Sequence, residues 1–304
     1  MMKILIFGGA GFLGSHVADF LSEQGHDVTI FDLKKSEYLQ KNQKMVVADM
    51  TDQAQVMNAV KGQDIIYNFA GVADINFAKD NPYETLTQNF IGNLNILEAC
   101  VKSNIKRYVF ASTLYVYSAL GSFYRASKQS CELTIESYAD HYNLDFTVLR
   151  FGSLYGPRAS ESNWVYRILS QALEKKKMVR EGDGEEIREY IHVHDAAKLS
   201  AKILEKDYRN QYIIISGNQS IKIKDLLVMV REMLNNSVDI EFIEGKNDHH
   251  YEITPYNFRP KLAKKISDSG YIDLGQGILD LIYNIADRKA SLDAELRQIL
   301  NSLP

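Results

Sequence analysis

The chain has 304 residues, of which 45% are hydrophobic and 24% charged, with a formal net charge of −4 at pH 7. This is the composition of a soluble globular chain, large enough for one big domain or two lobes, and it gives no reason to expect nucleic acid or an anionic membrane as a partner. No apolar run reaches the length of a membrane span, and the N-terminus enters a strand without a basic and apolar leader. We therefore expect a cytoplasmic protein, in which Cys100 and Cys131 are buried thiols in a reducing compartment.

Short apolar runs alternate with helical ones through the first half of the chain. The expected strands, each of them buried, are Lys3–Phe7, Asp27–Phe31, Lys44–Val47, Asp64–Ala70, Arg107–Ala111 and Phe146–Phe151. The expected helices between them are His16–Gln24, Gln53–Ala59, Tyr83–Ser103 and Ala126–Tyr142. This alternation predicts an α/β fold with a Rossmann-type doubly wound parallel sheet.

The pattern loosens after Tyr155-Gly156-Pro157. The later segments are expected to be helices at Asn163–Glu174, Ile223–Leu234 and Ser291–Leu303, and a strand at Tyr212–Ser216. We expect one nucleotide-binding domain over residues 1–155 that also uses about 186–217. Residues 156–185 and 218–304 would then form a smaller C-terminal lobe for the substrate.

Three glycines follow the first strand at the spacing G-x-x-G-x-x-G. Gly8 permits a tight turn, Gly11 lets the backbone approach a pyrophosphate, and Gly14 lets helix and strand pack closely. The N–H groups at the helix start favour phosphate. Such a turn can be merely structural, but its place between a strand and a helix indicates a dinucleotide site.

The ends of the next two strands carry carboxylates. Asp32 can accept hydrogen bonds from both adenosine ribose hydroxyls and would repel a 2′-phosphate, which favours NAD over NADP. Lys34 and Lys35 weaken this preference for NAD, because either could form an ion pair with the 2′-phosphate of NADP. Asp49 is a candidate ligand of the adenine amine, while Asp52 in the same segment suits a helix N-cap equally well.

A phenol and an ammonium stand four residues apart in Tyr124-Arg125-Ala126-Ser127-Lys128. On a helix these two side chains share a face, so Lys128 can lower the pKa of Tyr124 and make it a usable base near neutral pH. A proton carrier beside a dinucleotide site predicts hydride chemistry on a carbinol.

The order of these pieces resembles the extended short-chain dehydrogenase/reductases of the NAD-dependent sugar-nucleotide epimerase/dehydratase family, which includes UDP-glucose 4-epimerase. Besides the glycine turn and the Tyr124 to Lys128 pair, the matching segments are Asn68-Phe69-Ala70-Gly71, Asn89, Ser112-Thr113, Val116-Tyr117, Leu149-Arg150-Phe151, Tyr155-Gly156-Pro157-Arg158 and Arg188 to Asp195. The likeness covers about the first two thirds of the chain and fades after Gly217.

The resemblance implies a role for each matching residue. Thr113 would hydrogen-bond the reacting sugar oxygen, Tyr124 would take or return its proton, and Lys128 would hold the nicotinamide ribose and stabilise the tyrosinate. The implied cofactor ligands are Gly8, Gly11, Phe12, Leu13, Gly14, Asp32, Asp49, Met50, Phe69, Ala70, Gly71, Asn89, Tyr124, Lys128 and Phe151. The implied substrate ligands are Ser112, Thr113, Ser153 and Arg188. Thr113 can also be a strand-end hydroxyl that caps a turn, and Arg188 can form a surface ion pair with Glu185 or Glu186.

Departures from the family pattern reduce the number of reactions that we expect this chain to catalyse. Family dehydratases place an Asp-Glu pair after the Ser/Thr, and related decarboxylases use a nearby Glu, whereas this chain has Leu114-Tyr115. Elimination is therefore not expected. The loop from Thr113 to Tyr124 is shorter than in the sugar epimerases, and the family's Arg-x-Gly-Asp is replaced by the region of His249-His250-Tyr251.

These observations favour an NAD-dependent sugar-nucleotide 4-epimerase that acts through a 4-keto intermediate. A dehydrogenase or ketoreductase of a nucleotide-linked sugar is the alternative within enzymes, and a non-catalytic dinucleotide sensor is the alternative of another class. We expect no metal, because neither His192-x-His194 nor His249-His250 has an acidic or thiolate partner at ligand spacing.

The resemblance also implies a homodimer through a four-helix bundle. Its helices, Tyr83–Ser103 and Ala126–Tyr142, carry more apolar residues than one buried face requires. These residues are Leu86, Phe90, Ile91, Leu94, Ile96, Leu97, Leu133, Ile135 and Tyr138. The alternative is that the excess face meets the C-terminal lobe of the same chain.

Overall fold

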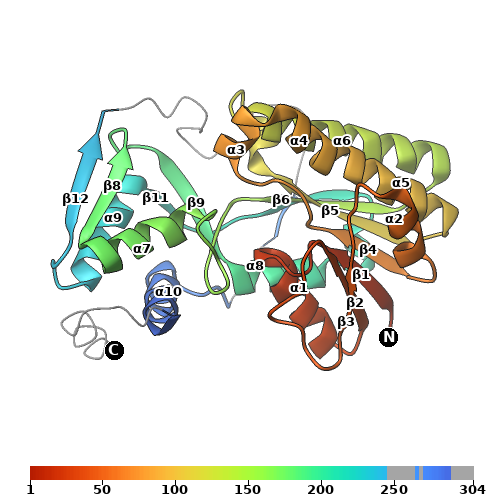
Figure 1. Cartoon of the computed structure of the whole chain (residues 1–304), viewed down its shortest axis with the longest axis horizontal. Helices are drawn as coiled ribbons and strands as arrows, with labels where there is room; N and C mark the ends of the chain where they lie inside the picture. Colours follow the sequence, from red (N-terminus) through yellow and green to blue (C-terminus); the bar gives the residue numbers. More distant parts are fainter. Residues whose placement is uncertain (245–263, 267–269, 289–304) are drawn as a thin grey trace. The chain divides into compact units, whose positions relative to one another are not determined.

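The computed structural model describes residues 1–244, 264–266 and 270–288, which divide into two compact units (Figure 1). The first unit consists of Met1–Phe151 and Ala196–Ile215 with strand β13 (Lys264–Lys265). The second consists of Gly152–Asp195 with the described parts of Ser216–Thr254 and Asp268–Pro304. Among the described residues, no helix is both long enough and apolar enough to cross a membrane.

The first unit is built on one parallel sheet. Its eight strands in the described residues follow the order β13-β10-β6-β5-β4-β1-β2-β3. Besides β13, these are β1 (Lys3–Phe7), β2 (Asp27–Asp32), β3 (Lys44–Val47), β4 (Ile65–Asn68), β5 (Arg107–Thr113), β6 (Phe146–Phe151) and β10 (Gln211–Ile215). The strand order reverses between β1 and β4, so the prediction of a Rossmann-type doubly wound sheet is confirmed.

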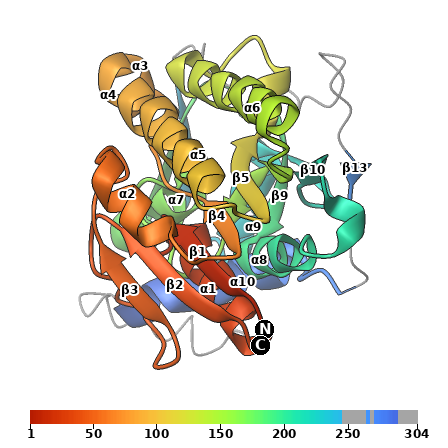
Figure 2. The same cartoon turned by 90° about the vertical axis from the view of Figure 1, so that its right-hand side faces the viewer.

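Helices cover both faces of this sheet, which explains why its central strands are continuous apolar runs (Figure 2). One face carries α2 (Gln53–Val60), α5 (Gly92–Lys102) and α6 (Ser122–Tyr142); the other carries α1 (Phe12–Glu23) and α8 (Val193–Lys202). The core under α2, α5 and α6 includes Leu5, Phe7, Ile66, Ile96, Leu97, Phe110, Ile135 and Val148, all at most 1% exposed. Strand Lys44–Val47 was expected to be buried, but Val47 is 58% exposed. The reason is that β3 lies at the edge of the sheet.

The expected helix Tyr83–Ser103 consists of three segments. After α3 (Ile75–Asp80), the chain forms α4 (Pro82–Leu86), a π-helical turn η1 (Thr87–Ile91) and then α5. Single π-helical turns inside α-helices occur frequently at functional sites. Two short 3₁₀ helices complete the first unit, η2 (Leu114–Tyr117) and η3 (Lys206–Tyr208).

The second unit has its own sheets and core. One sheet has the order β11-β9-β7 and the other pairs β12 with β8. The strands are β7 (Ser153–Tyr155), β8 (Lys177–Glu181), β9 (Ile187–His192), β11 (Ser220–Lys222) and β12 (Asp239–Ile243). The helices are α7 (Trp164–Lys175), α9 (Ile223–Met233) and α10 (Leu274–Arg288). Their shared core includes Ile168, Leu169, Leu227, Ile278 and Ile282.

The two units differ from the predicted domain boundaries. Strand β13 belongs to the first unit, although it falls in the range 218–304 that was predicted for the smaller lobe. Residues 152–155 and 186–195 belong to the second unit, not the first. The physical reason is strand pairing, since β7 pairs with β9 and β9 pairs with β11 in a sheet that is separate from the parallel one. The predicted helix Ser291–Leu303 lies outside the described residues.

Candidate active site

The glycine turn after β1 has no space for side chains. Gly8 has φ +74°, and a Cβ there would lie 2.6 Å from the backbone nitrogen of Ala70. A Cβ on Gly14 would lie 2.2 Å from the carbonyl oxygen of Gly8. The turn is closed by Gly11 N–H donating to Gly8 O at 3.1 Å, and α1 then begins without a side-chain cap from Gly11. Such a turn leaves a backbone cradle at the helix start, which fits a dinucleotide pyrophosphate.

Asp32 lies directly beside this turn. It ends β2, and its Oδ2 accepts a hydrogen bond from Ala10 N–H at 3.0 Å. A carboxylate has about four acceptor sites, so Asp32 retains capacity for ribose hydroxyls. This arrangement suits the predicted role of Asp32 toward NAD.

The segment after β3 is ordered by its own polar side chains. Asp49 Oδ1 accepts from both the N–H and the hydroxyl of Thr51, each at 2.8 Å. Asp52 accepts from Ala54 N–H and Gln55 N–H at the start of α2, so the interpretation of Asp52 as a helix N-cap is confirmed. Met50 is buried against α5, where a Cβ on Gly92 would lie 2.8 Å from its Cγ.

Asn89 of the π-helical turn holds the loop that follows β4. Its Oδ1 accepts from Val72 N–H at 2.7 Å, and its Nδ2 donates to Val72 O and to Ser127 Oγ, each at 2.9 Å. Gly71 has φ +130°, and a Cβ there would lie 2.4 Å from Asn89 Oδ1. Asn89 therefore links the segment Phe69-Ala70-Gly71 to α6, while its direct contact with the cofactor stays a prediction.

The predicted catalytic residues lie at the carboxyl end of β5 and on α6. Lys128 Nζ donates to Ala111 O at 2.8 Å and lies 5.9 Å from the centroid of the Tyr124 ring. Thr113, the last residue of β5, accepts from Tyr115 N–H at 3.2 Å and so caps the 3₁₀ turn η2. That bond uses an acceptor site of Thr113 and leaves its hydroxyl hydrogen to be donated to a ligand.

Burial lowers the pKa of Lys128 below that of an exposed lysine. Desolvation lowers the pKa of Lys128 to about 8, although Cys131 and Glu132 act in the opposite direction. The side chain is only 7% exposed and lies 4.7 Å above the Phe110 ring. Lys128 is therefore mostly an ammonium at pH 7 and an amine at pH 9.

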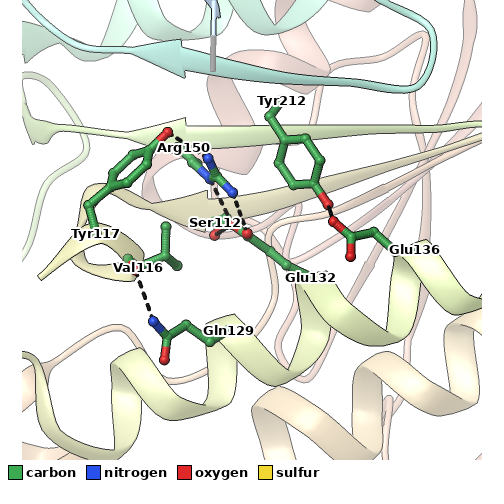
Figure 3. A network of polar contacts seen from close by, with 8 residues as sticks. All are labelled: Ser112, Val116, Tyr117, Gln129, Glu132, Glu136, Arg150 and Tyr212. Atoms are coloured by element: carbon green, nitrogen blue, oxygen red, sulfur yellow. Dashed lines mark hydrogen bonds and ion pairs between the residues drawn. The ribbon is translucent and has the colours of Figure 1, made fainter. Parts of the chain in front are cut away.

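A buried polar network joins this part of α6 to the sheet (Figure 3). Ser112 Oγ donates to Glu132 Oε1 at 2.5 Å, and Glu132 forms an ion pair with Arg150 at 2.6 Å. The Glu132 and Arg150 side chains are 4% and 1% exposed. Ser112 thus donates its hydroxyl hydrogen inside the protein, and its predicted contact with substrate stays a prediction.

Phe69 and Phe151 close the same edge of the sheet. Phe69 follows β4, Phe151 ends β6, and their ring centroids lie 6.4 Å apart. Ligands of open α/β sheets bind outside the carboxyl ends of the strands, near the point where the strand order reverses. The first unit therefore brings the predicted cofactor residues to one sheet edge, together with Thr113, Tyr124 and Lys128.

Ser153 and Arg188 belong to the second unit. Ser153 is the register partner of Tyr190 between β7 and β9, and Arg188 is the partner of Ile221 between β9 and β11. Arg188 is 6% exposed, and its Nη1 donates to Ile187 O at 3.0 Å. Their contacts with substrate stay predictions.

The acids named as alternative partners of Arg188 form ion pairs with other cations. Glu185 pairs with Lys222 and Lys224, and Glu186 pairs with Arg180.

No metal centre is found in the part of the chain that the structure describes, where no three His, Cys, Asp or Glu side chains are grouped for an ion. The rings of His192 and His194 lie 5.0 Å apart. Burial and His194 lower the pKa of His192 to about 4, so His192 is neutral at pH 7. His249 and His250 lie outside the described residues.

Comparison with known proteins shows the family to which the chain belongs. Residues 4–215 match the model of the NAD dependent epimerase/dehydratase family, which is more than half of the chain. The chain belongs to this family. It is therefore an enzyme that uses NAD, and the glycine turn and Asp32 fit that cofactor.

Individual relatives are distant. UDP-N-acetyl-alpha-D-glucosaminuronate decarboxylase of Bacillus cytotoxicus is 27% identical over 290 residues, covering 86% of this chain and 90% of that protein. The structure of UDP-N-acetylglucosamine 4-epimerase from Methanobrevibacter ruminantium in complex with UDP-N-acetylmuramic acid is 26% identical with a TM-score of 0.82, covering 95% and 99% of the two chains. UDP-glucose 4-epimerase of Thermus thermophilus, solved with NAD, has a TM-score of 0.80 at 24% identity, covers 95% and 100%, and shows the shared fold.

Sequence reasoning did not predict the polar partners of the site. Glu132 and Arg150 were not candidates, although two signals pointed to them. Glu132 stands four residues after Lys128 on the same helix, and Arg150 is the one charged residue of the buried strand β6. An arginine in such a strand requires a buried anion.

Proposed function

We propose that this enzyme is a sugar-nucleotide 4-epimerase that acts through a transient 4-keto intermediate. The observation that carries the proposal is the arrangement of Tyr124 and Lys128 on α6 beside the strand end at Thr113, with no carboxylate in the turn that follows. Leu114 and Tyr115 stand in that turn, and Leu114 is fully buried. Among the described residues, the helix α6 and the strand end thus offer groups for moving one proton at a carbinol, while the turn after Thr113 supplies no carboxylate for elimination.

The chain's own groups suffice for the proton half of the reaction. Thr113 would donate its hydroxyl hydrogen to the reacting C4 oxygen, while Tyr124 would take the proton from that oxygen and later return it. The Lys128 ammonium would stabilise the tyrosinate and hold the nicotinamide ribose. Bound NAD would supply the hydride acceptor and donor for C4. Gly8, Gly11 and Gly14 would hold its pyrophosphate and Asp32 its adenosine ribose.

The relatives support a nucleotide sugar as the substrate. The Methanobrevibacter ruminantium enzyme is a 4-epimerase solved with a UDP-sugar, and the Bacillus cytotoxicus protein is named for a UDP-sugar acid. Decarboxylation by the second enzyme does not transfer to this chain in our proposal, because no carboxylate follows Thr113.

A dehydrogenase or ketoreductase of the same substrate class is the second candidate. The observation that favours it is the short connection between Thr113 and Tyr124, most of which is taken up by η2 and the turn at Gly121. A keto intermediate must turn over before the hydride returns to its other face, and a short loop limits the room for this motion.

Product analysis decides between the two. The purified protein is incubated with UDP-glucose, UDP-N-acetylglucosamine and UDP-glucuronate in turn, and the sugars are followed by proton NMR while absorbance at 340 nm reports net reduction of NAD. We expect one substrate to equilibrate with its C4 epimer without net change at 340 nm. Stoichiometric growth at 340 nm with release of a keto sugar would instead establish the dehydrogenase.

We also propose that the chain forms a homodimer through α4, η1, α5 and α6. Several apolar side chains on these elements remain uncovered, since Tyr83 is 84%, Leu133 56% and Ile91 43% exposed. The sequence-based argument is weaker than expected for Ile96, Leu97 and Ile135, because these side chains are buried in the core of their own unit.

A further inference from the structure

One row of side chains on α6 connects the proposed catalytic residues to three strands. Tyr124, Lys128, Glu132 and Glu136 follow one another at intervals of four residues, so that each is a neighbour of the next on the helix surface. Lys128 binds β5 through Ala111 O, and Glu136 accepts a hydrogen bond from Tyr212 of β10. Glu132 lies between them and contacts both β5 and β6 (Figure 3).

The contacts of Glu132 are directional on both strands. Ser112 and Arg150 are register partners between β5 and β6, so their side chains lie on the same face of the sheet. Glu132 Oε1 accepts from Ser112 Oγ at 2.5 Å and from Arg150 Nε at 3.0 Å, while Oε2 accepts from Arg150 Nη2 at 2.6 Å. This bidentate geometry fixes the carboxylate against two strands at once.

Arg150 is itself held from every side. Its Nη1 donates to the Tyr117 hydroxyl at 2.5 Å, and its guanidinium carbon lies 4.7 Å from the Tyr117 ring centroid and 4.4 Å from that of Tyr212. Tyr117 belongs to η2, the turn that Thr113 caps. A second bond, from Gln129 Nε2 to Val116 O at 2.9 Å, joins α6 to the same turn.

Burial of this ion pair calls for a reason other than stability. Two charges that are 4% and 1% exposed lose their hydration, and well-packed apolar residues of similar volume are often as stabilising as such a pair. An apolar pair would not fix the position of α6 along its axis, because hydrophobic contact lets the helix slide. A bidentate ion pair does fix that position.

We propose that Glu132 and Arg150 are positioning residues for the reaction: they fix α6 along its axis against β5 and β6, and thereby hold Tyr124 and Lys128 in register with Thr113. The inference rests on the proposed function in so far as Tyr124, Lys128 and Thr113 carry the proton transfer. Neither Glu132 nor Arg150 contacts the reacting atoms in this account.

A double replacement separates position from stability. Glu132→Leu combined with Arg150→Met removes both charges and their hydrogen bonds while keeping apolar volume, so we expect a folded protein. Glu132→Gln alone leaves the Arg150 charge buried without its anion, and its Tm should fall below that of the double variant. Glu98→Gln is the control, because it makes the same change at a carboxylate of α5 that binds Tyr138 and Lys102.

The kinetic readout is the split between kcat and KM. For the double variant we expect kcat to fall at least ~10-fold, since small displacements of catalytic groups have effects of this size, while KM and the Kd for NAD stay within about two-fold. The Glu98→Gln control should keep kcat within about two-fold of the parent. A double variant that is folded and turns over like the parent would show that the pair is only a structural element.

A second readout does not depend on turnover. The ε-carbon of Lys128 is titrated by NMR in ¹³C-lysine-labelled protein, with Lys128→Met to assign its signal. The groups that face Lys128 are Tyr124, Cys131 and Glu132 on α6, with Arg150 of β6 behind Glu132 and no titratable side chain on Phe110 or Ala111 of β5. Loss of the Glu132 charge should move the titration of Lys128 to lower pH in both the single and the double variant.

The kinetic and NMR measurements together separate a failure of the proposed function from a failure of the proposed positioning role. If the parent protein epimerises none of the sugars, the proposed function is wrong, and the NMR titration still decides whether Glu132 and Arg150 control Lys128. An unchanged titration in the double variant would mean that Glu132 does not lie beside Lys128. That result would overturn the proposal whatever the parent's activity, because the proposal requires Glu132 to hold the part of α6 that carries Lys128.

Discussion

Tyr124 is the residue on which the proposed chemistry depends most directly. It shares a helix face with Lys128, whose Nζ lies 5.9 Å from its ring centroid. We expect Tyr124→Phe to lower turnover at least ~100-fold, the usual scale for removing a positioned acid or base, with the fold and the Kd for NAD nearly unchanged. Steady-state kinetics and a dinucleotide titration measure the two effects.

The control for this substitution lies on the same helix. Tyr138→Phe makes the same chemical change at a hydroxyl that donates to Glu98, far along α6 from the site, and should leave turnover close to the parent's. Turnover of Tyr124→Phe within a few-fold of the parent would remove Tyr124 from the mechanism.

The lowered pKa of Lys128 should make the free energy of unfolding depend on pH. Its pKa is about 8 in the folded protein and 10.5 when unperturbed, so between these values the unfolded chain binds more protons and the lysine's contribution to stability rises with pH. Below pH 8 the folded protein bears the full cost of burying the ammonium, on the order of 3 kcal/mol. Lys128→Met removes that cost, although it also loses the hydrogen bond to Ala111.

The measurement is the difference in Tm between Lys128→Met and the parent. This difference should favour the variant most below pH 8 and decline as the pH rises toward 10.5. Lys102→Met, at a side chain that is 55% exposed, should show no such decline. A difference for Lys128→Met that is flat across this range would mean that Lys128 is not held in a desolvated site.

At the scale of elements, the turn between β1 and α1 makes the sharpest prediction. An added Cβ at Gly14 meets the Gly8 carbonyl oxygen at 2.2 Å, so Gly14→Ala must push α1 away from β1. We expect the Kd for NAD to rise at least ~10-fold and the Tm to fall, because the amide groups of the helix start lose their position. Isothermal titration and thermal unfolding measure both.

Gly25→Ala provides the comparison at the other end of α1. Gly25 has φ +81° but nothing within 4 Å of an added Cβ, so alanine there is strained without a collision. It should cost about 1 kcal/mol of stability and leave the affinity for NAD unchanged. Equal losses of affinity in the two variants would show that the cradle itself is not the binding element.

The sequence predicts the elements of the first unit better than those of the second. The bounds of strands Lys3–Phe7 and Phe146–Phe151 match the prediction to the residue, because a buried parallel strand is a compact apolar run. The bounds of Lys44–Val47 match as well, although this edge strand is not buried. Strands β7, β9 and β11 were not recognised. β7 and β11 have only three residues each, and β9 mixes charged with apolar residues. All three pair with segments more than 25 residues away in the chain, so local pattern carries little of the information that forms them.

Some features of the candidate site could also be predicted from the sequence, and others could not. Glycine spacing and the Tyr124 to Lys128 interval are local and could be predicted from the sequence. Glu132 with Arg150 and Asn89 with Val72 join segments far apart in the chain, and only the folded structure brings them together.

At the scale of the whole molecule, the exposed apolar residues of α6 predict assembly. The chain mass is 34.6 kDa, and light scattering at micromolar concentration should give about twice that value for the parent. Leu133→Asp should return the mass to that of one chain, because a charge at the centre of an apolar interface lacks a partner. Phe242→Asp, at an exposed phenylalanine of β12, should leave the mass unchanged. A parent protein of one chain mass would contradict the dimer.

The strand β10 is the seventh of the parallel strands in chain order, yet it pairs with β6, which ends sixty residues before it begins. During synthesis on the ribosome, the first segment of the second unit, Gly152–Asp195, must therefore emerge before the edge of β6 is covered. Until then Arg150 lacks the Tyr212 ring, and Thr147 lacks the carbonyl of Tyr208 to which its hydroxyl donates. An open apolar strand edge invites pairing with other chains. The nascent protein thus passes through an interval in which a chaperone that shields strand edges would raise the yield of folded enzyme.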